Sequence, residues 1–408
     1  MNYLKREAER KFLKMSSNFK AVLVTGARQV GKSTMLKHLA ENSNRRFVSM
    51  DSVRDRELAE NDPDLFFQTY RPPLLIDEIQ KAPALFEKIK MICDDSDERS
   101  MFWLTGSQSK RLLKEANESL AGRMGILRMY GYSQREIRKT DMQVKLGYSF
   151  EELENRSVLI DENNINSVFS GIWRGGMPDA AGLDEESLGD FFDSYIESYL
   201  MRDAVDDEKI SDTNKFRKFL LSCATINAQL VNFSTLADAA EISIPTAKEW
   251  LASLERMGII YLLRPYSDNE LKRIVKTPKL YFCDTGLCAH LSRWTSFESL
   301  MNGASNGVFF ENYVVMEFVK YYSCSKERAE LSFYRDQNGK EIDLVIEKEG
   351  VIHPIEIKLG TLPDKRNIKK FDVFDRTAVK RSRGGIVCMC QKPFPIDENN
   401  NYIPCSLI

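Results

Sequence analysis

The sequence predicts an α/β protein. A parallel sheet with helices on both faces comes first, then a helical region with a winged helix-turn-helix, then a further α/β domain. Two observations predict the first part: strand-like apolar runs alternate with helical patterns, and a Gly-rich loop separates one such run from a helix. The third observation is Asn338-Gly339 between two strand-like runs, which predicts a hairpin in the last third of the chain.

Five apolar runs predict the strands of the first sheet. They cover residues 21–25, 47–50, 73–77, 101–105 and 126–129. Helical patterns separate them, and strands that alternate with helices pair in parallel within one sheet.

Composition sets limits on the class of protein. The chain has 408 residues, which predicts two to four domains. Lys plus Arg number 58 and Asp plus Glu 60, so the net charge is -2. A protein that binds nucleic acid over its whole surface is therefore not expected, and any such binding must come from local patches.

Cysteine use and hydropathy predict the compartment. Eight cysteines are spread along the chain without a Cys-x-x-Cys pair, and there are only three histidines, so we expect reduced thiols and no zinc site. The N-terminus is charged throughout, and no stretch approaches 18 consecutive apolar residues. We therefore expect no signal peptide, no membrane span and a cytoplasmic protein.

The most specific motif is a phosphate-binding loop that fits G-x-x-x-x-G-K-S. It consists of Gly26, Ala27, Arg28, Gln29, Val30, Gly31, Lys32, Ser33 and Thr34. The glycines permit a tight loop whose N–H groups surround phosphate oxygens, and the helix that follows adds positive charge at its N-terminus. Lys32 is expected to reach the β- and γ-phosphates, and the Ser33 hydroxyl to bind Mg²⁺.

A second motif of this site ends a neighbouring strand. Asp77 and Glu78 follow the apolar residues 74–76. Asp77 fits the second Mg²⁺ partner, and Glu78 fits the group that polarises the attacking water. A solvated acidic turn is the alternative interpretation.

Two further positions are candidates for the same chemistry. Thr105 or Ser107, at the end of the next strand, is positioned to contact the γ-phosphate, and turn capping is an equal alternative. Arg123, flanked by glycines, could supply positive charge to the transition state in cis or in trans, and a salt bridge is an equal alternative. Arg135 and Arg202 are weaker candidates for this role.

These motifs together resemble a known group of proteins. The runs VTGARQVGKST, LLIDEIQ, LTGSQ and SLAGR resemble an AAA-type ATPase group of bacteria and archaea. In that group the ATPase is fused to a C-terminal domain long described as of unknown function. The resemblance continues in YIESYLMRDAV, FFENYVVMEF, FYRDQNGKEIDLVI and IEIK, and it implies ATP as the nucleotide.

The middle of the chain combines an acidic stretch with a helix-turn-helix pattern. Residues 184–212 contain eleven acids and two bases, and 191–205 have a helical pattern whose polar face we interpret as solvated. In residues 233–263, Ser234 caps a first predicted helix, Pro245 opens a second and Gly258 ends it. A strand and a basic wing at 269–279 follow. Such a unit binds DNA or docks protein, and both readings stay open.

The last third contains a second cluster of charges. With a turn at Glu349-Gly350, paired residue numbers sum to 699, so Asp343 lies opposite Glu356 and shares a face with Lys358. Two such carboxylates can share a divalent metal ion, which would be a second metal besides Mg²⁺ at the ATP site. The opposite face is expected to hold apolar side chains, namely Ile342, Leu344, Ile355 and Ile357.

This cluster resembles the D…ExK core of the restriction-endonuclease-like fold. Glu311, on the preceding helix, is a further candidate ligand. Residues 358–383 carry nine Lys or Arg against three Asp, which favours phosphate contact. An inactive inherited fold with cross-strand charge pairing is the alternative.

The predicted organisation is an ATPase domain at 1–140, a linker and acidic helical region at 141–212, a winged helix-turn-helix at 213–290 and an endonuclease-like domain at 291–408. The predicted function is an ATP-hydrolysing enzyme coupled to a DNA-binding or nuclease-like C-terminal half. The alternative is a regulatory ATP switch that binds a protein partner and lacks nuclease activity. Besides ATP, double-stranded DNA, a protein partner and further copies of the chain are candidate partners.

Overall fold

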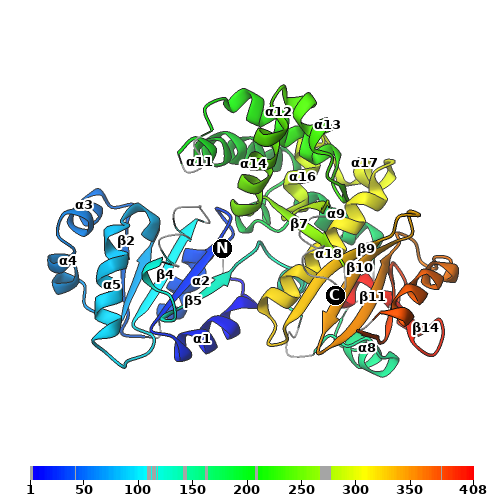
Figure 1. Cartoon of the computed structure of the whole chain (residues 1–408), viewed down its shortest axis with the longest axis horizontal. Helices are drawn as coiled ribbons and strands as arrows, with labels where there is room; N and C mark the ends of the chain where they lie inside the picture. The colour runs from blue at the N-terminus through cyan, green and yellow to red at the C-terminus, as the bar shows by residue number, and fades with distance from the viewer. Residues whose placement is uncertain are drawn as a thin grey trace.

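The computed structural model describes residues 3–41, 43–107, 112, 116, 118–140, 145–160, 164–206, 210–266, 277–377 and 379–408. Figure 1 shows an N-terminal sheet with its helices on one side of the molecule and the helical and C-terminal regions on the other. Within these residues, no helix has the length and apolar composition needed to cross a membrane.

The N-terminal sheet has five parallel strands, and the predicted α/β class is confirmed. Their order is β2-β3-β4-β1-β5. The strands are β1 (Ala21–Gly26), β2 (Arg46–Ser49), β3 (Leu74–Asp77), β4 (Phe102–Ser107) and β5 (Met124–Arg128). Each overlaps one of the five predicted runs, and the three central strands, β3, β4 and β1, are fully buried, as apolar parallel strands usually are.

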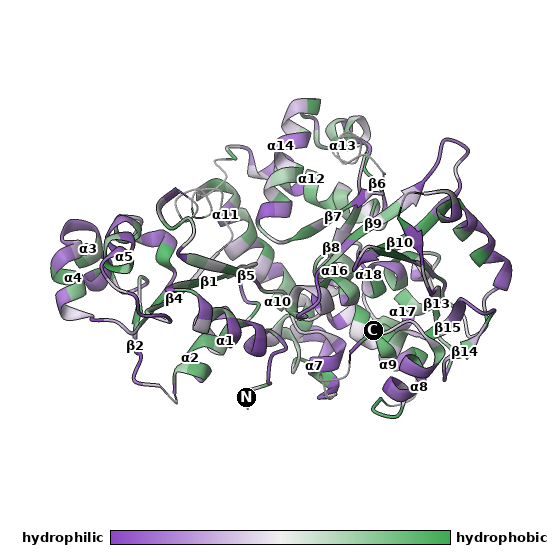
Figure 2. Ribbon diagram, turned by 60° about the horizontal axis from the view of Figure 1, so that its bottom comes forward, coloured by the Kyte–Doolittle hydropathy of each residue, from purple (hydrophilic) through white to green (hydrophobic). Residues whose placement is uncertain are grey.

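Helices cover both faces of this sheet. Leu23 and Leu104 point to a core closed by α3 (Val53–Asn61), α4 (Pro63–Thr69) and α5 (Ala84–Asp94). Val22 and Trp103 point to the opposite core, closed by α1 (Ala8–Asn18) and α2 (Lys32–Ala40). Successive strand residues alternate between faces, so the central strands β1, β3 and β4 are buried on both faces. Figure 2 shows the same pattern, with apolar strands between more polar helices.

The helical region packs into one large core with the C-terminal region. This core extends from Leu146 to Ile408, and Arg156 Nε donates to Leu407 O at 2.6 Å. The helices between the two sheets are α7 (Gln134–Arg138), α8 (Phe150–Ser157), α9 (Ile165–Arg174), η2 (Pro178–Ala180), α10 (Glu185–Tyr195), η3 (Ile196–Leu200) and α11 (Met201–Asp206). The described part of 141–212 is therefore an integral part of that core.

The predicted helix pair is present and ends in short strands. The elements are α12 (Thr213–Thr225), β6 (Gln229–Leu230), α13 (Phe233–Ala240), α14 (Ile244–Arg256), β7 (Ile260–Pro265) and β8 (Lys279–Phe282). The cap of α13 is Asn232, whose side chain accepts from Ser234 N at 3.1 Å, so the prediction of Ser234 was wrong. Ser243 caps α14 and Gly258, with φ of +75°, follows its end. Most of the predicted basic wing, 269–276, lies outside the described residues.

A mixed sheet joins this helix pair to the C-terminal region. Its order is β14-β15-β13-β11-β10-β9-β7-β8-β6, with β12 beside β11. The remaining elements are α16 (Thr285–Leu291), α17 (Phe297–Asn302), α18 (Asn306–Cys324), β9 (Ala329–Arg335), β10 (Glu341–Lys348), β11 (Val351–Ile357), η4 (Lys365–Arg376), β12 (Lys380–Arg381), β13 (Gly384–Cys388), β14 (Phe394–Pro395), β15 (Asn400–Pro404) and η5 (Cys405–Leu407). Strands on both sides of residue 290 belong to this sheet, because β7 pairs with β9. The sheet is therefore continuous across the predicted domain boundary.

The hairpin of β10 and β11 has the predicted register. Leu344 pairs with Ile355 and Lys348 with Val351, and the turn is Glu349-Gly350. A β-bulge between Ile342 and Val345 changes one detail. Ile342 packs in the core under η4, away from Leu344, so its predicted face was wrong.

Candidate functional site

The phosphate-binding loop lies between β1 and α2 and depends on two glycines. Gly26 has φ of +150°, and a Cβ there would lie 2.1 Å from Met129 O. Gly31 has φ of +89° and directly precedes α2, which begins at Lys32. Only glycine fits these two positions without strain, and the loop N–H groups therefore sit at a helix N-terminus, where anions bind.

Lys32 is buried beneath this loop. Its Nζ donates to Gly26 O at 3.1 Å and to Ala27 O at 2.7 Å. Burial lowers the pKa of Lys32 to about 8, against the opposing effect of Glu78. The ammonium is thus held at the loop by carbonyl oxygens, with acids nearby but no direct carboxylate partner among the described residues.

Asp77 ends β3 and gathers two hydroxyl donors. The hydroxyls of Ser33 and Thr105 both donate to its Oδ1. Thr105 Oγ1 also accepts from Glu78 N at 3.0 Å. Ser33 and Asp77, predicted as Mg²⁺ partners, are therefore in direct contact, and Thr105 is occupied in holding both acids.

Glu78 stands at the turn that follows β3. Its backbone is left-handed, with φ of +55°, which directs the chain away from the sheet after Asp77. Gln80 Nε2 donates to Glu78 Oε2. The second acid is thus held by a side-chain amide, while the first is held by hydroxyls.

Ser107 ends β4 beside the phosphate-binding loop. It pairs in register with Gly26, is 5 % exposed, and its Oγ has no hydrogen-bond partner in the described structure. Buried oxygens of Thr25, Gln29 and Gln80 in the same area also lack one. Buried polar atoms normally have partners, so these oxygens fit a site that receives phosphate, Mg²⁺ and water. The residues present therefore fit ATP and Mg²⁺.

The three candidate arginines lie in different parts of the structure. Arg123 precedes β5, whose Met124 pairs with Ala21 at the start of β1, and it donates to Asp94. It lies at the end of the sheet opposite the phosphate-binding loop, so the expectation of a contribution in cis was wrong. Arg135 is buried and paired with Glu7 at 2.6 Å. Arg202 lies in α11.

Sequence reasoning missed a residue that touches the loop from outside the first domain. Arg28 Nε donates to Asp203 of α11, 175 residues away. Asp203 belongs to the acidic stretch interpreted as solvated, yet it is only 8 % exposed. The excess of acids was the available sign, and nothing in the spacing identified the partner.

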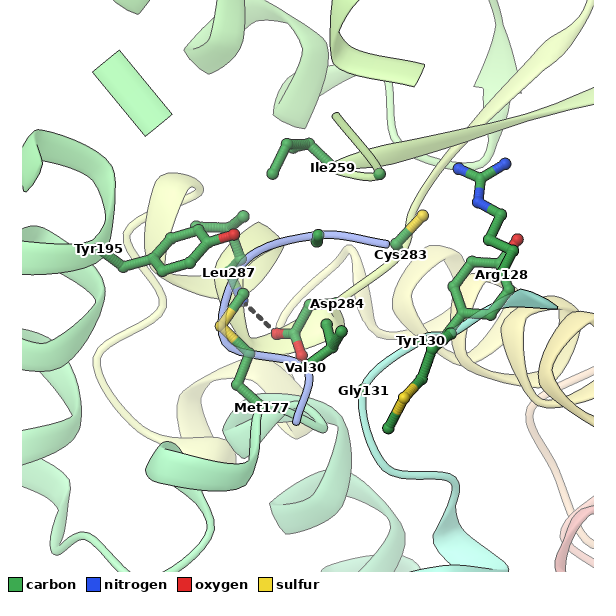
Figure 3. A pocket seen from close by; sticks show the side chains of 13 residues that line it. Val30, Arg128, Tyr130, Gly131, Met177, Tyr195, Ile259, Cys283, Asp284 and Leu287 are labelled. Carbon is green, nitrogen blue, oxygen red and sulfur yellow. Dashed lines mark hydrogen bonds between the residues drawn. The ribbon is translucent and has the colours of Figure 1, made fainter. Parts of the chain in front are cut away.

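The loop also borders a small cavity of about 20 Å³ formed with residues from outside the first domain. Figure 3 shows the loop at Val30 facing Met177, Tyr195, Ile259 and Asp284. Burial raises the pKa of Asp284, which accepts from Gly176 N at 2.8 Å. The cavity has room for about one water molecule, so the contact is close.

The C-terminal charges gather as predicted for Asp343, Glu356 and Lys358. Lys358 Nζ lies 3.1 Å from Asp343 Oδ2 and 2.6 Å from Glu356 Oε1. Ile357 N donates to Asp343 Oδ2 at 2.9 Å, and Lys370 of η4 reaches Glu356 Oε1 at 2.6 Å. Glu356 is fully buried, and its Oε2 has no partner among the described residues.

Glu311 of α18 lies beside this cluster but has its own partners. Its Oε1 accepts from Lys279 Nζ at 2.9 Å and from Tyr281 OH at 2.7 Å. Lys279 also pairs with Glu341 at 2.6 Å. The cluster therefore alternates carboxylates with lysines.

Burial and neighbouring charges shift the pKa values of these three acids in different directions. Burial, and then Asp343, raise the pKa of Glu356 to about 7. Burial, and then Asp343, also raise the pKa of Glu311. Burial acts in the same direction on Asp343, but Lys358 and Lys279 outweigh it and lower the pKa of that carboxyl. Across the described ranges, no three His, Cys, Asp or Glu side chains are grouped so that they could hold a metal ion.

Three family models match separate parts of the chain. One described as an AAA domain matches residues 18–138. Two described as domains of unknown function match residues 166–298 (DUF8612) and 306–408 (DUF4143).

Similar proteins have been found over most of the chain. Uncharacterized proteins of Mycobacterium tuberculosis and Mycobacterium bovis are each 25% identical over 99% of this chain and 84% of their own length. Among solved structures, the Walker-type ATPase PABY2304 of Pyrococcus abyssi is 15% identical, with a TM-score of 0.46 over 71% of this chain and 96% of that one. The Thermotoga maritima RuvB Holliday junction branch migration motor is 16% identical, with a TM-score of 0.31 over 63% and 89%. The chain thus combines a domain similar to AAA domains, with the sheet of P-loop ATPases, and a C-terminal domain that matches DUF4143.

Proposed function

We propose that the chain binds and hydrolyses ATP. The observation that carries this proposal is the cluster in which the phosphate-binding loop, Ser33, Asp77 and Thr105 meet beside buried oxygens that have no partner among the described residues. Loop N–H groups and Lys32 would hold the β- and γ-phosphates, and Ser33 and Asp77 would hold Mg²⁺. Bound Mg²⁺ would neutralise charge on the phosphates.

The remaining groups have roles that follow from their positions. Glu78 accepts the proton of the attacking water once its contact with Gln80 opens. Ser107, whose hydroxyl lies next to Gly26 and has no partner in the described part of the chain, donates to the γ-phosphate. Thr105 fixes Asp77 and the backbone of Glu78 and is a positioning residue.

Lys32→Ala tests this proposal directly. ATP binding should fall sharply and turnover should stop, because the buried cation at the loop is lost. Lys37→Ala is the matched control, since Lys37 is an exposed lysine of the same helix, α2. Undiminished binding and turnover in Lys32→Ala would refute the assignment.

We further propose that the C-terminal half acts on or near DNA. The observation that favours it is the buried Glu356 Oε2, which has no partner within the described ranges and lies beside Asp343 and two lysines. The two carboxylates, with water or a phosphate oxygen as further ligands, are candidates for a second divalent metal, with Lys358 on the phosphate. The basic residues of 358–383 and a winged helix at 213–290 would provide backbone contacts.

A single helix provides a physical connection between the two sites. Near its first turn α18 carries Glu311, and near its end Lys11 of α1 donates to Ser323 O at 2.5 Å. In between, Glu317 accepts from Gln134 N at 2.9 Å and Lys320 donates to Tyr132 O at 2.9 Å. A shift of the ATPase domain would therefore be transmitted along α18 to the C-terminal cluster.

The alternative is a regulatory ATP switch that binds a protein partner. It is favoured by the lysines that already neutralise the C-terminal acids. ATPase and nuclease assays with and without duplex DNA, in Mg²⁺ and in Mn²⁺, separate the two. DNA-stimulated ATP turnover or cleavage that Asp343→Asn abolishes supports the DNA function, and the absence of both supports the switch.

A further inference from the structure

An ion pair between Arg28 and Asp203 joins the phosphate-binding loop to the helical region. Arg28 Nε lies 2.8 Å from Asp203 Oδ1 and 2.6 Å from Oδ2. The Arg28 guanidinium also lies 5.7 Å from the centre of the Tyr199 ring. A cationic side chain of the phosphate-binding loop is therefore bound by a carboxylate.

The helix that carries Asp203 is irregular at the point of contact. α10 continues through a π-helical turn, η3, into α11, so Tyr199 lies in the turn and Asp203 just beyond it. π-Helical turns inside α-helices often occur at functional sites. This segment lies outside residues 18–138 and within 166–298, so the second matched region supplies a residue to the loop of the first.

The surrounding contact is close enough to transmit movement. Gly258 lies directly against the loop, since a Cβ there would be 3.1 Å from Ala27 N. Tyr195 of α10 and Val30 line the small cavity shown in Figure 3. The loop that carries Arg28 is therefore in close contact with α10 and with the turn at Gly258.

Both charges of the ion pair act on Lys32, the lysine that is proposed to hold the β- and γ-phosphates. Burial dominates the lowering of the pKa of Lys32, and among the charges Arg28 lowers it further while Asp203 raises it. Bound phosphates would bring several negative charges near the same guanidinium. Asp203 would then compete with them for Arg28 and repel them.

We propose that the phosphates of a nucleoside triphosphate compete with Asp203 for Arg28, so that ATP binding releases α11 from the phosphate-binding loop. This deepens the proposed function and rests on it. By thermodynamic linkage, the free energy by which bound ATP weakens the ion pair must equal the free energy by which the ion pair weakens ATP binding.

Asp203→Asn is the main test, with binding measured by calorimetry and hydrogen exchange measured over residues 196–206. Removing the competing carboxylate should tighten ATP binding by roughly 5–50-fold, within the usual range of coupling between sites. In the unchanged protein ATP should raise exchange in 196–206. In Asp203→Asn exchange should already be high and insensitive to ATP.

Arg28→Gln distinguishes the release of α11 from the attraction between Arg28 and the phosphates of ATP. It also breaks the pair, so exchange in 196–206 should rise, but ATP binding should not tighten because the cation is lost. Glu197→Gln is the matched control, since Glu197 lies in the same helical segment and pairs with Arg217. It should alter neither measurement.

The outcomes distinguish this inference from the proposed function. If the unchanged protein does not bind ATP, the proposed function fails. If it binds ATP but Asp203→Asn binds equally or more weakly, or exchange in 196–206 does not respond to ATP, only the competition for Arg28 is overturned.

Discussion

The molecule contains two buried polar sites that balance charge in opposite ways. At the phosphate-binding loop, Lys32 is held by carbonyl oxygens, and the Ser107 hydroxyl has no partner among the described residues. At the C-terminal cluster, each acid is matched by a lysine, as Asp343 is by Lys358 and Glu311 by Lys279. The first site is built to receive a polyanion with its cation. The second is nearly neutral by itself, so a ligand there must displace a lysine or use the free oxygen of Glu356.

The largest expected effect is a loss of ATP turnover at the first site while ATP binding is retained. Glu78→Gln keeps the shape of the side chain and the contact between Ser33 and Asp77 but removes the proton acceptor. Turnover should fall by roughly 10²–10⁴-fold, while ATP binding is retained. Calorimetry and phosphate release measure the two quantities, with Glu57→Gln, an exposed acid of α3, as the control. Collapse of binding would instead make Glu78 structural or a direct metal ligand.

A smaller effect on ATP turnover is expected from removing either of two hydroxyls at the end of β4, those of Ser107 and Thr105. Ser107→Ala should lower turnover by about 10–100-fold with little change in ATP binding or stability, because its Oγ makes no bond to the described protein. Thr105→Ala loses bonds to Asp77 and Glu78 N and should also lower the free energy of unfolding by about 1–2 kcal/mol. Turnover and denaturant curves for the pair check this contrast. Equal loss of stability in both variants would show that Ser107 has a structural bond.

The sequence predicted where the phosphate-binding loop and Asp77 lie in the fold, because the determinants of that arrangement are local. A strand, a loop of fixed spacing and a helix lie within residues 21–40. Asp77 and Glu78 stand at the end of another predicted strand, where such acids are expected. The register of the hairpin was equally predictable, because the turn at Glu349-Gly350 fixes every pair.

Contacts between distant segments could not be predicted in this way. The bulge that turns Ile342 to the other face depends on the pairing with β9. The pairing of β7 with β9 and the bond between Arg28 and Asp203 join segments dozens to hundreds of residues apart. Neither hydrophobic period nor motif spacing carries such information, and an acidic stretch reads as solvated unless its partner is known.

The second site is sharpened by a metal titration. If it binds a divalent cation, saturating Mn²⁺ at about 100 times Kd should stabilise the protein by about 2.7 kcal/mol, seen as a rise in melting temperature. Asp343→Asn should abolish the rise and leave ATP turnover intact. Asp372→Asn is the control, since Asp372 is an exposed acid that pairs with Lys340 in the same region. If the unchanged protein shows no rise, the lysines alone balance the site, and the regulatory switch is favoured.

The smallest expected effect concerns a charge outside both sites. Arg123 is paired with Asp94 at the far end of the first sheet and does not reach the phosphate-binding loop of its own chain. In dilute protein, Arg123→Ala should therefore change ATP turnover by less than about 2-fold, since exposed ion pairs contribute little. An arginine that completes the site of a neighbouring copy would instead cost about 10³–10⁵-fold, and only at concentrations where copies assemble. Turnover per chain measured over a range of protein concentrations, together with the oligomeric state by light scattering, separates the two. A large loss that grows with assembly would show that the chain works as a homo-oligomer, with Arg123 acting in trans.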